Sequence, residues 1–490
     1  MTCQSFWRST EHASIFQIFA APIRITAVVL FMLLLVRGAS AVASDTKKSG
    51  TVPACAFSGA EFDAATDVHA LDEYRDAIAQ LLKQERFADI ECVANAAQAG
   101  KTRFAGGAWK LRNVFEGLDS PRPGHPTQDD WQQHMALLER WEKQDPRSLT
   151  VRIALAESYV SYAWDARGTG VSDSVSDSGW KLFGERIAQA RSILDGIAAT
   201  DRKSPDWFVA MQLVAQGQSW DLPEETALFQ QAVALEPGYQ YYYRVFANYL
   251  LPQWHGEDGD ASRFAEEAAN RRGGDAGDLL YFQIAEGNIC ACEDPEFTHF
   301  SWPRLQKGFA VLEKQYGPSL LVVNSFALMA SKSGDWIAAD PAFKRIGDNW
   351  DKDVWRTEAW FKSNRSIAAQ VAPSQLRARA FRQKAEANMK SPDGQAYRVN
   401  FDPKFAAYER SCSNDKNADP SKFDLLVQVG ANGSVEESHT EKQPTAFARC
   451  IMRALYASYV GKETPFPPPP KGSYEMILEI DPATLNATAK

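Results

Sequence analysis

The amino-acid sequence predicts a mainly α-helical protein, in which a long helical-repeat (solenoid) domain is followed by a small α+β domain. From about residue 69 to 375, apolar residues recur three and four positions apart, the spacing of one helix face. Near residue 423 the pattern changes to the alternation that is typical of strands. A chain of 490 residues is also long enough for several domains. We expect a leader over 1–43, helical repeats over 44–395 and the α+β domain over 396–490.

The first 43 residues have the features of a signal peptide. Arg24 precedes the apolar run Ile25–Val36, and Ala41-Val42-Ala43 supplies a cleavage pattern of small residues. A transmembrane helix needs about 20 apolar residues, so this run is short for a permanent span. The sequence thus predicts cleavage and export to the periplasm or beyond the cell, with no transmembrane span afterwards. The alternative is an uncleaved inner-membrane anchor.

The charge balance indicates what kind of partner to expect. The formal net charge is -9, and no run of Lys and Arg and no basic half is present. Proteins that bind nucleic acid rely on such cations to neutralise phosphates, so nucleic acid is not an expected partner. We expect one or more protein partners in the cell envelope, and the sequence leaves the oligomeric state open.

Six cysteines follow the expected leader: Cys55, Cys92, Cys290, Cys292, Cys412 and Cys450. An even number of cysteines in an exported chain indicates disulfides. They fall into three local pairs, and we expect Cys55 to bond Cys92 and Cys412 to bond Cys450. For Cys290-Ala291-Cys292 the alternatives are a strained local bridge, two separate thiols, or a redox or metal site.

Pairs of predicted helices recur along the helical region with a shared phase. Counting from Pro146 as a turn, the next unit places Leu155-Ala156 and Tyr159 where the tetratricopeptide pattern has Leu, a small residue and Tyr. Pro237 gives the same phase independently. The region therefore resembles a degenerate tetratricopeptide-like solenoid over roughly 300 residues. An irregular helical bundle is the alternative.

A third copy of the pattern runs from Ala327 to Phe343 and departs from it at one place. Asp340-Pro341 falls within the second helix of this copy, where a proline breaks a helix. We expect that helix to start late, with Asp340 as its N-cap and Pro341 in its first turn.

A second resemblance covers about residues 145–285. The segments Ala163–Gly170, Gly217–Trp220 and Leu251–Asp260 are rich in Trp, Gly and Asp, and they look like an uncharacterised bacterial family that is defined only as a domain of unknown function. The resemblance implies helical repeats and no particular activity.

The C-terminal region has the order strand, strand, helix, strand. Phe423–Val429 alternates, Ala431-Asn432-Gly433 supplies a turn, and a second strand starts at Val435. A helix opens at Pro444, and the last strand covers Tyr474–Ile480. The region is similar to the C-terminal domain of TonB energy transducers. This similarity implies a periplasmic protein-binding module that adds a strand to a partner.

The sequence contains no G-x-S-x-G, H-E-x-x-H, P-loop or dinucleotide-binding motif. We therefore assign no catalytic residue, no cofactor and no metal ligand. One loop, His255–Asp260, carries His255, Glu257, Asp258 and Asp260, whose oxygens suit a divalent cation. A polar loop of this kind is more often simply solvated.

The best candidate for a binding surface is Trp164, Asp165 and Arg167, with Trp180, Trp220 and Asp221 expected nearby. Trp and Arg contribute strongly to interfaces, and Arg binds carboxylates through two parallel hydrogen bonds. In one alternative, Asp165 pairs with Arg167 and only braces the loop that follows. In another, Asp165 or Glu157 serves as the base of an enzyme.

The function predicted from these features is that of an exported envelope scaffold, which binds proteins through helical repeats and a strand-adding C-terminal module. The alternative is a periplasmic hydrolase of carbohydrate or peptide, with acids near Asp165 and Glu257. Two acids about 5 to 10 Å apart in a pocket would favour the hydrolase.

Overall fold

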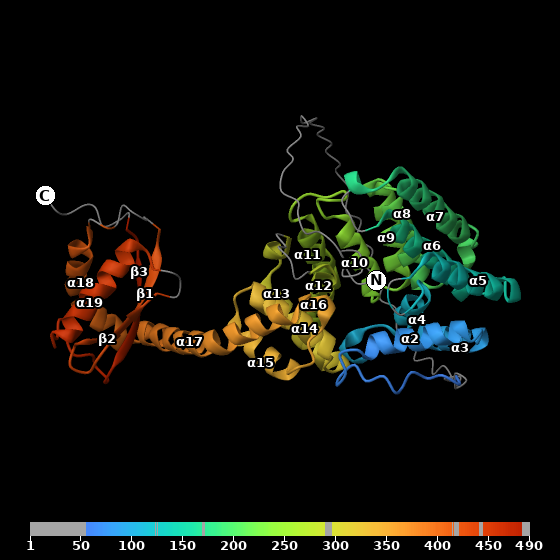
Figure 1. Ribbon diagram of the computed structural model, residues 1–490. Coiled ribbons are helices and arrows are strands. Elements are labelled where there is room, and N and C mark those ends of the chain that lie inside the picture. The colour runs from blue at the N-terminus through green and yellow to red at the C-terminus, as the bar shows by residue number, and fades with distance from the viewer. Residues whose placement is uncertain are drawn as a thin grey trace, which may run out of the picture. The chain divides into compact units, whose positions relative to one another are not determined.

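The structure is a computed structural model that describes residues 55–122, 124, 126–168, 172–289, 296–413, 415, 421–440 and 444–482. The expected leader, Cys290 and Cys292 lie outside these ranges. The chain forms two compact units (Figure 1). The N-terminal unit consists of Met1–Ser333 and Ala342–Phe361, and the C-terminal unit of Gly334–Pro341 and Lys362–Lys490.

The N-terminal unit is built from helices joined by short connections. In chain order they are α2 (Ala70–Lys83), α3 (Phe87–Gly100), α4 (Lys110–Leu118), α5 (Gln128–Gln144), α6 (Leu149–Arg167), α7 (Asp177–Asp195), α8 (Pro205–Gly217), α9 (Leu222–Leu235), α10 (Gln240–Tyr249), α11 (Asp260–Arg272), α12 (Gly274–Asn288), α13 (Trp302–Tyr316), α14 (Leu320–Lys332), α15 (Trp336–Ile346) and α16 (Lys352–Trp355). The boundary between the units crosses α15. The prediction of a mainly helical protein is confirmed.

Alternate helices of this unit form a continuous row. α4 packs against α6, α6 against α8, α8 against α10 and α10 against α12. The helices between them pack beside the row, as α7 does on α6 and α8, and α11 on α10 and α12 (Figure 1). Small side chains within the row, including Ala156, Ala210 and Ala247, are fully buried, so neighbouring backbones approach closely.

Two glycines permit the closest helix contacts of the unit. A Cβ atom at Gly277 of α12 would overlap the carbonyl oxygen of Ala269 on α11. A Cβ atom at Gly308 of α13 would overlap the carbonyl oxygen of Asp278 on α12 in the same way. Any side chain at these positions would push the helices apart, so the residue type follows from the packing.

Polar caps begin several helices. Thr127 and Asp130 form a capping box at the start of α5, and Ser148 accepts a hydrogen bond from the backbone N–H of Val151 (3.1 Å) at the start of α6. Each cap satisfies a backbone donor that the first helical turn leaves unpaired.

The expectation that a helix starts at Asp340 is wrong. α15 begins earlier, at Trp336, and Pro341 lies within it. The carboxylate of Asp335 accepts a hydrogen bond from the backbone N–H of Ala338 (3.0 Å), and the helix follows the positive-φ residue Gly334 (φ 69°). A good cap one turn before Asp340 therefore decides where the helix begins, and the helix accommodates the proline.

The C-terminal unit combines helices with a three-stranded antiparallel sheet. Its elements are α17 (Glu358–Lys390, of which Lys362 onward belongs to this unit), α18 (Pro392–Ser411), β1 (Phe423–Val429), β2 (Val435–His439), α19 (Ala446–Val460) and β3 (Tyr474–Ile480). The strand order is β2-β1-β3. The predicted order of strand, strand, helix and strand is confirmed.

Both faces of this sheet are covered. On one face, side chains of β1 and β3 such as Val427 and Leu478 pack with Phe401 of α18 and Ile451 of α19. On the other face, Leu426 and Ile477 pack against Phe381 and Ala385 of α17. Successive side chains of a strand point to opposite faces, so the alternation in the sequence supplies both cores.

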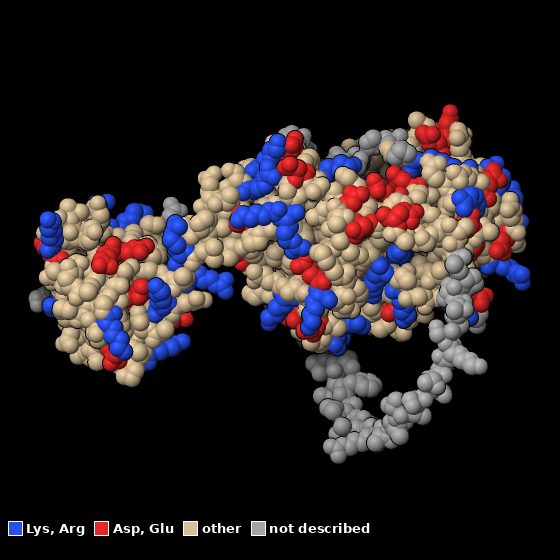
Figure 2. Space-filling view, turned by 90° about the horizontal axis from the view of Figure 1, so that it is seen from below, with Lys and Arg blue, Asp and Glu red and all other residues tan. Residues whose placement is uncertain are grey.

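The surface carries a mixture of charges. On the face drawn in Figure 2, basic and acidic side chains are interspersed over both units, and this face has no continuous basic stripe.

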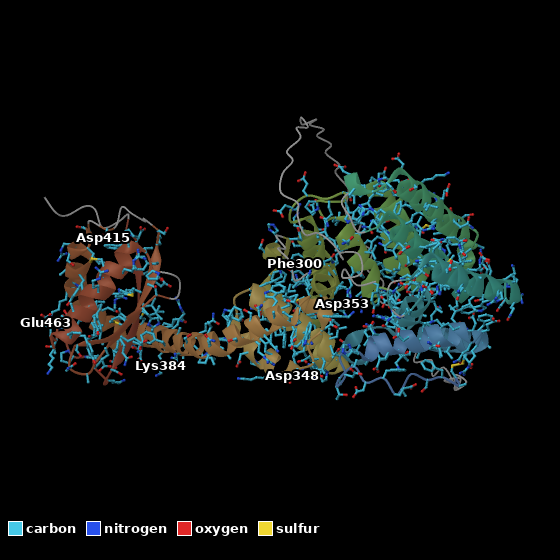
Figure 3. All side chains as sticks on the ribbon, in the orientation of Figure 1. Phe300, Asp348, Asp353, Lys384, Asp415 and Glu463 are labelled. Carbon is cyan, nitrogen blue, oxygen red and sulfur yellow. A yellow bond between two sulfur atoms is a disulfide. The ribbon has the colours of Figure 1, made fainter. Side chains whose placement is uncertain are left out.

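Two disulfides are present among the described residues (Figure 3). Cys55 bonds Cys92 of α3 in the N-terminal unit. Cys412, which follows α18, bonds Cys450 of α19 in the C-terminal unit. Both pairings agree with the expectation from sequence spacing. Each bridge restricts the unfolded chain and so stabilises the unit that contains it.

None of the described helices combines the length and the apolar character that crossing a lipid bilayer requires.

Candidate functional site

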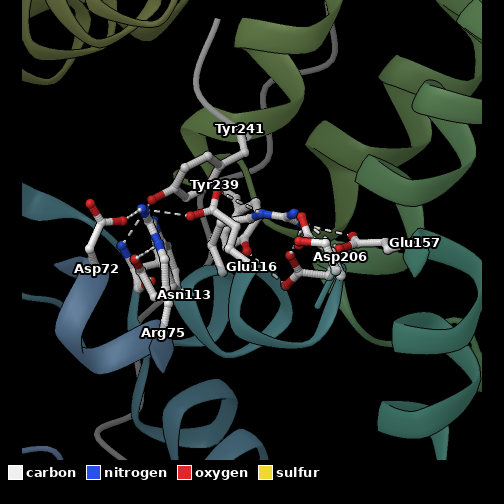
Figure 4. A network of polar contacts seen from close by, with 12 residues as sticks. Asp72, Arg75, Asn113, Glu116, Glu157, Asp206, Tyr239 and Tyr241 are labelled. Atoms are coloured by element: carbon white, nitrogen blue, oxygen red, sulfur yellow. Dashed lines mark hydrogen bonds and ion pairs between the residues drawn. The ribbon is translucent and has the colours of Figure 1, made fainter. Parts of the chain in front are cut away.

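One buried network joins several acidic and basic side chains of the N-terminal unit (Figure 4). Its centre is Arg112 of α4, which is 1% exposed. Arg112 donates two hydrogen bonds to the carboxylate of Glu157 on α6, at 2.7 and 3.0 Å. A third bond, of 2.9 Å, reaches Asp206 at the start of α8. The hydroxyl of Tyr239 donates to the second oxygen of Asp206 (2.7 Å), so three helices and the loop before α10 are joined.

A second guanidinium extends the network toward α2. Arg75 forms an ion pair with Glu116 (2.6 Å) and donates to the side-chain oxygen of Asn113 (2.9 Å). Glu116 also pairs with Arg112 (3.2 Å) and thereby connects the two cations. Because each of these charged groups has a partner of opposite charge or a hydrogen bond, the cost of burying it is offset.

Burial sets the protonation of this network. It raises the pKa of Glu157 to about 7, although Arg112 acts in the opposite direction. It also raises the pKa of Asp206. Two guanidiniums here face three buried carboxylates, those of Glu116, Glu157 and Asp206. Burial therefore favours the protonated form of Glu157 and Asp206, and Arg112 opposes it.

This network does not have the geometry of an active site. Glu157 is 1% exposed and Asp206 is fully buried. A general base must reach the proton that it abstracts, directly or through one water, and the packed helices keep a substrate away from both carboxylates. The network joins helices that are distant in the sequence, and it serves the fold.

A second cluster lies at the surface, where α6 ends and α7 begins. We call it the aromatic edge: Trp164, Arg167, Trp180, Phe183 and Trp254. The guanidinium of Arg167 lies 5.6 Å from the ring centre of Trp164 and 5.4 Å from that of Trp180. Trp164 also contacts Phe183 and Trp254, at 4.9 and 5.9 Å between ring centres. Partial burial lowers the pKa of Arg167, which nevertheless stays charged at neutral pH.

The cluster is accessible from solvent. The side chain of Trp180 is 40% exposed, and Trp164, Arg167 and Trp254 are half-buried. Three of the sequence-predicted residues, Trp164, Arg167 and Trp180, are thus brought together.

The other three predicted binding residues take different places. Asp165 is exposed on α6. Asp221 is the N-cap of α9, where it accepts a hydrogen bond from the backbone N–H of Glu224 (2.9 Å). Trp220 lies under the guanidinium of Arg191, 4.8 Å from its ring centre.

The His255–Asp260 loop is held together by its own contacts. Asp260 accepts a hydrogen bond from the backbone N–H of Glu257 (2.6 Å) and pairs with Arg263. Asp258 contacts His299 (3.0 Å), and His255 stacks on Tyr249 with 4.3 Å between ring centres. In the part of the chain that the structure describes, no three His, Cys, Asp or Glu side chains are grouped as a metal site would require.

Sequence reasoning missed most of the buried network. Arg112 and Asp206 are 94 positions apart, and neither belongs to a motif. One weak signal in the sequence could have indicated the network. Arg112 falls on the face of α4 that also carries Leu111 and Phe115, and a charged residue on an apolar face is buried only when it is paired.

Fold and site together define a mainly helical protein with an attached α+β unit, a buried ionic network and an aromatic surface. Scans against protein-family models, curated proteins and solved structures find no match to the chain.

Proposed function

We propose that this chain is an exported, non-enzymatic binding protein of the cell envelope, a scaffold whose two units contact different protein partners. The observation that carries the proposal is the aromatic edge, where Arg167 lies between the rings of Trp164 and Trp180 at the surface. The buried carboxylates, by contrast, are used by the fold.

Trp and Arg are the residues that contribute most to binding energy at protein interfaces. A guanidinium between two indole rings is pre-oriented, so little side-chain entropy is lost when a partner binds. The exposed part of Trp180 supplies apolar contact area. Arg167, which also donates a hydrogen bond to the carbonyl of Gly168 (3.2 Å), supplies positive charge beside it.

The row α4, α6, α8, α10 and α12 supports the idea of a helical-repeat body, because stacked helical hairpins place every second helix in one layer. Export is supported by the leader-like sequence over 1–43 and by the two disulfides, which persist in oxidising compartments.

The C-terminal unit is proposed to bind by strand addition, and its own contacts favour one edge for this. The outer edge of β3 is already used: Asn388 donates to the carbonyl of Glu475 (3.1 Å), and the backbone N–H of Ile477 contacts the sulfur of Met389 (3.3 Å). The carbonyl of Ile477 accepts from Arg398 (3.5 Å). A partner strand therefore adds to β2 in this proposal.

The register identifies the residue of β2 that would pair with the partner. The N–H and C=O of Ile477 point away from β1. Leu426, the residue of β1 opposite Ile477, therefore directs its own N–H and C=O toward β2, where it pairs with His439. Backbone groups of successive strand residues point to opposite sides, so Ser438 offers its N–H and C=O to the open edge of β2.

The hydrolase alternative has less support. Asp165 is exposed on α6. Glu257 lies in a separate surface loop, where its backbone N–H donates a hydrogen bond to Asp260. The carboxylates of Glu157 and Asp206 share Arg112, but they are buried and paired with a cation, unlike the acids of a glycosidase cleft.

Crosslinking of the tagged, full-length chain in its own cell envelope, followed by mass spectrometry, tests the proposal. The double variant Trp180→Ala/Arg167→Ala should lose one captured protein that the matched variant Leu182→Ala, also 40% exposed on α7, retains. Ser438→Pro, which removes the outward N–H of β2, should lose a second partner that Ser438→Ala keeps. If all four variants capture the same proteins as the wild type, the scaffold proposal fails.

A further inference from the structure

A groove in the N-terminal unit lies between α9, α10, α11 and the start of α12. Its volume is about 490 Å³, within the range of roughly 300–1,000 Å³ that is typical of small-molecule sites. Most of its lining is apolar and comes from Phe229, Val233, Tyr243 and Ala268, while two cations, Arg271 and Arg272, stand at one side. None of the lining residues is acidic.

Neither arginine forms an ion pair or a hydrogen bond with any residue that the structure describes. Most other described arginines of the N-terminal unit do, for example Arg244, Arg263 and Arg304. Both lie close enough to Tyr243 to lower the pKa of its hydroxyl, against a larger raising effect of burial. The cations are therefore directed at the groove and remain available to a ligand.

The position of the two arginines at the end of α11 follows from the sequence. They form the last turn of α11, and Gly273 and Gly274 follow with φ of 70° and 52°. The left-handed backbone ends the helix immediately after the arginines. Ala276, in the first turn of α12, is exposed and also lines the groove.

The aromatic rings of the groove pack closely against their neighbours. The ring of Phe229 contacts the rings of Tyr243, Phe246 and Phe264, at 5.2, 4.7 and 5.3 Å between ring centres. The hydroxyl of Tyr243 donates to the carbonyl of Pro237 (3.2 Å), which fixes the ring orientation. A ligand that lies on these rings meets a surface that needs no reorganisation.

We infer that this groove binds a molecule in which an apolar body carries a carboxylate. The apolar body lies on Phe229 and Val233, where it gains the free energy of leaving water. The carboxylate accepts charge-assisted hydrogen bonds from Arg271 and Arg272, which are roughly twice as strong as neutral ones. The groove is separate from the aromatic edge, and the inference does not depend on the scaffold function.

Two sources share this chemistry: a free aromatic or aliphatic acid, and the C-terminal carboxylate of a peptide with apolar side chains. Isothermal titration calorimetry measures binding of two carboxylate probes to the full chain. One is 4-phenylbutyrate, with its amide as the control. The other is a short peptide ending in Phe with a free C-terminus, with the amidated peptide as the control. Saturation by the free acid identifies a small-molecule site, and saturation by the free-carboxylate peptide alone identifies a site for chain ends.

Three variants connect the binding to the groove. Arg271→Ala/Arg272→Ala should weaken the carboxylate probe by about tenfold or more. Ala276→Trp, which fills the groove from an exposed position, should abolish binding of the probe. The matched control Lys307→Ala/Lys314→Ala removes two exposed cations of α13 and should leave binding unchanged.

The inference is overturned if neither carboxylate probe saturates the wild-type chain. It is also overturned if the amides bind as tightly as the acids, or if Arg271→Ala/Arg272→Ala binds like the control. Circular dichroism of each variant confirms that the fold is retained, and all the substituted residues are exposed.

Discussion

Arg112 and Arg167 belong to the same helical unit and have opposite surroundings. Arg112 is 1% exposed and contacts three carboxylates, those of Glu116, Glu157 and Asp206. Arg167 is half-buried and lies between two indole rings. The comparison shows how one residue type is enclosed by carboxylates in one place and lies beside aromatic rings at the surface in another.

The difference follows from the cost of removing a charge from water. A fully buried guanidinium needs carboxylates, because an unpaired buried charge costs several kcal/mol. A guanidinium at the surface keeps part of its hydration, so the weaker attraction of aromatic rings is sufficient to orient it. Substitutions at the two sites should therefore affect different properties of the protein.

The largest effect is expected for Arg112→Ala. It leaves three buried carboxylates without their common cation, so the free energy of unfolding should fall by about 3 to 5 kcal/mol. Urea unfolding followed by tryptophan fluorescence measures this loss. The control is Arg140→Ala, which removes an exposed arginine paired with Glu85 (3.0 Å) and should cost less than about 1 kcal/mol. Equal losses in the two variants would contradict the role given to Arg112.

Two conservative changes next to Arg112 sharpen the comparison. Glu157 accepts two hydrogen bonds from Arg112. In Glu157→Gln, the NH₂ group of the amide would face an N–H of the guanidinium, so two donors would meet without an acceptor. The free energy of unfolding should fall by about 2 to 3 kcal/mol. Asp206 accepts one bond from Arg112 and one from Tyr239, whose hydroxyl can rotate and accept from an amide instead. Asp206→Asn should therefore cost less, about 1 kcal/mol. Urea unfolding at pH 7 ranks the pair, and the reverse order would refute this account of the hydrogen bonds.

The sequence predicts much of the fold because its signals there are local. Alternating residues in 423–429 and 474–480 locate the strands β1 and β3, and the cysteine spacing indicates the pairs Cys55–Cys92 and Cys412–Cys450. Trp164 and Arg167 are also close in the sequence, one helical turn apart, so their meeting on α6 could be expected.

The buried network could not be predicted in this way. Arg112 is 45 positions from Glu157 and 94 from Asp206, and each charge taken alone resembles a solvated side chain. Trp254 likewise reaches Trp164 only through the packing of α10 beside the earlier helices. The start of α15 was misjudged because Asp335 and Asp340 are both acceptable caps, and the sequence does not rank them.

A buried carboxyl group without a cation supplies a further contrast with Arg112. Glu225 of α9 is fully buried, and its described hydrogen-bond donor is the amide of Gln212 (2.9 Å). Burial raises its pKa from 4.5 to about 8. Between these values the folded chain binds a proton that the unfolded chain has released, so stability falls as the pH rises.

Glu225→Gln should remove this part of the pH dependence. The wild type should lose up to about 2 kcal/mol more than the variant between pH 5 and pH 7. Urea unfolding at pH 5, 6 and 7 gives the slopes, and Glu224→Gln, which changes the exposed neighbour, should keep the slope of the wild type. If Glu225→Gln and Glu224→Gln have equal slopes, Glu225 is ionised in the folded chain.

The smallest effect on stability is expected for Arg167→Ala, and this completes the comparison with Arg112. Loss of a partly exposed cation beside two rings should lower the free energy of unfolding by less than about 1 kcal/mol. Arg186→Ala is a stricter control than Arg140→Ala, because Arg186 also lies over an aromatic ring, that of Tyr162. Its hydrogen bond to the carbonyl of Tyr162 (2.6 Å) is shorter than the bond from Arg167 to the carbonyl of Gly168 (3.2 Å). Urea unfolding should show a larger loss for Arg186→Ala than for Arg167→Ala, while partner capture should be reduced for Arg167→Ala. A loss for Arg167→Ala as large as that for Arg112→Ala would show that the aromatic edge supports the fold, and it would remove the reason for assigning this surface to binding.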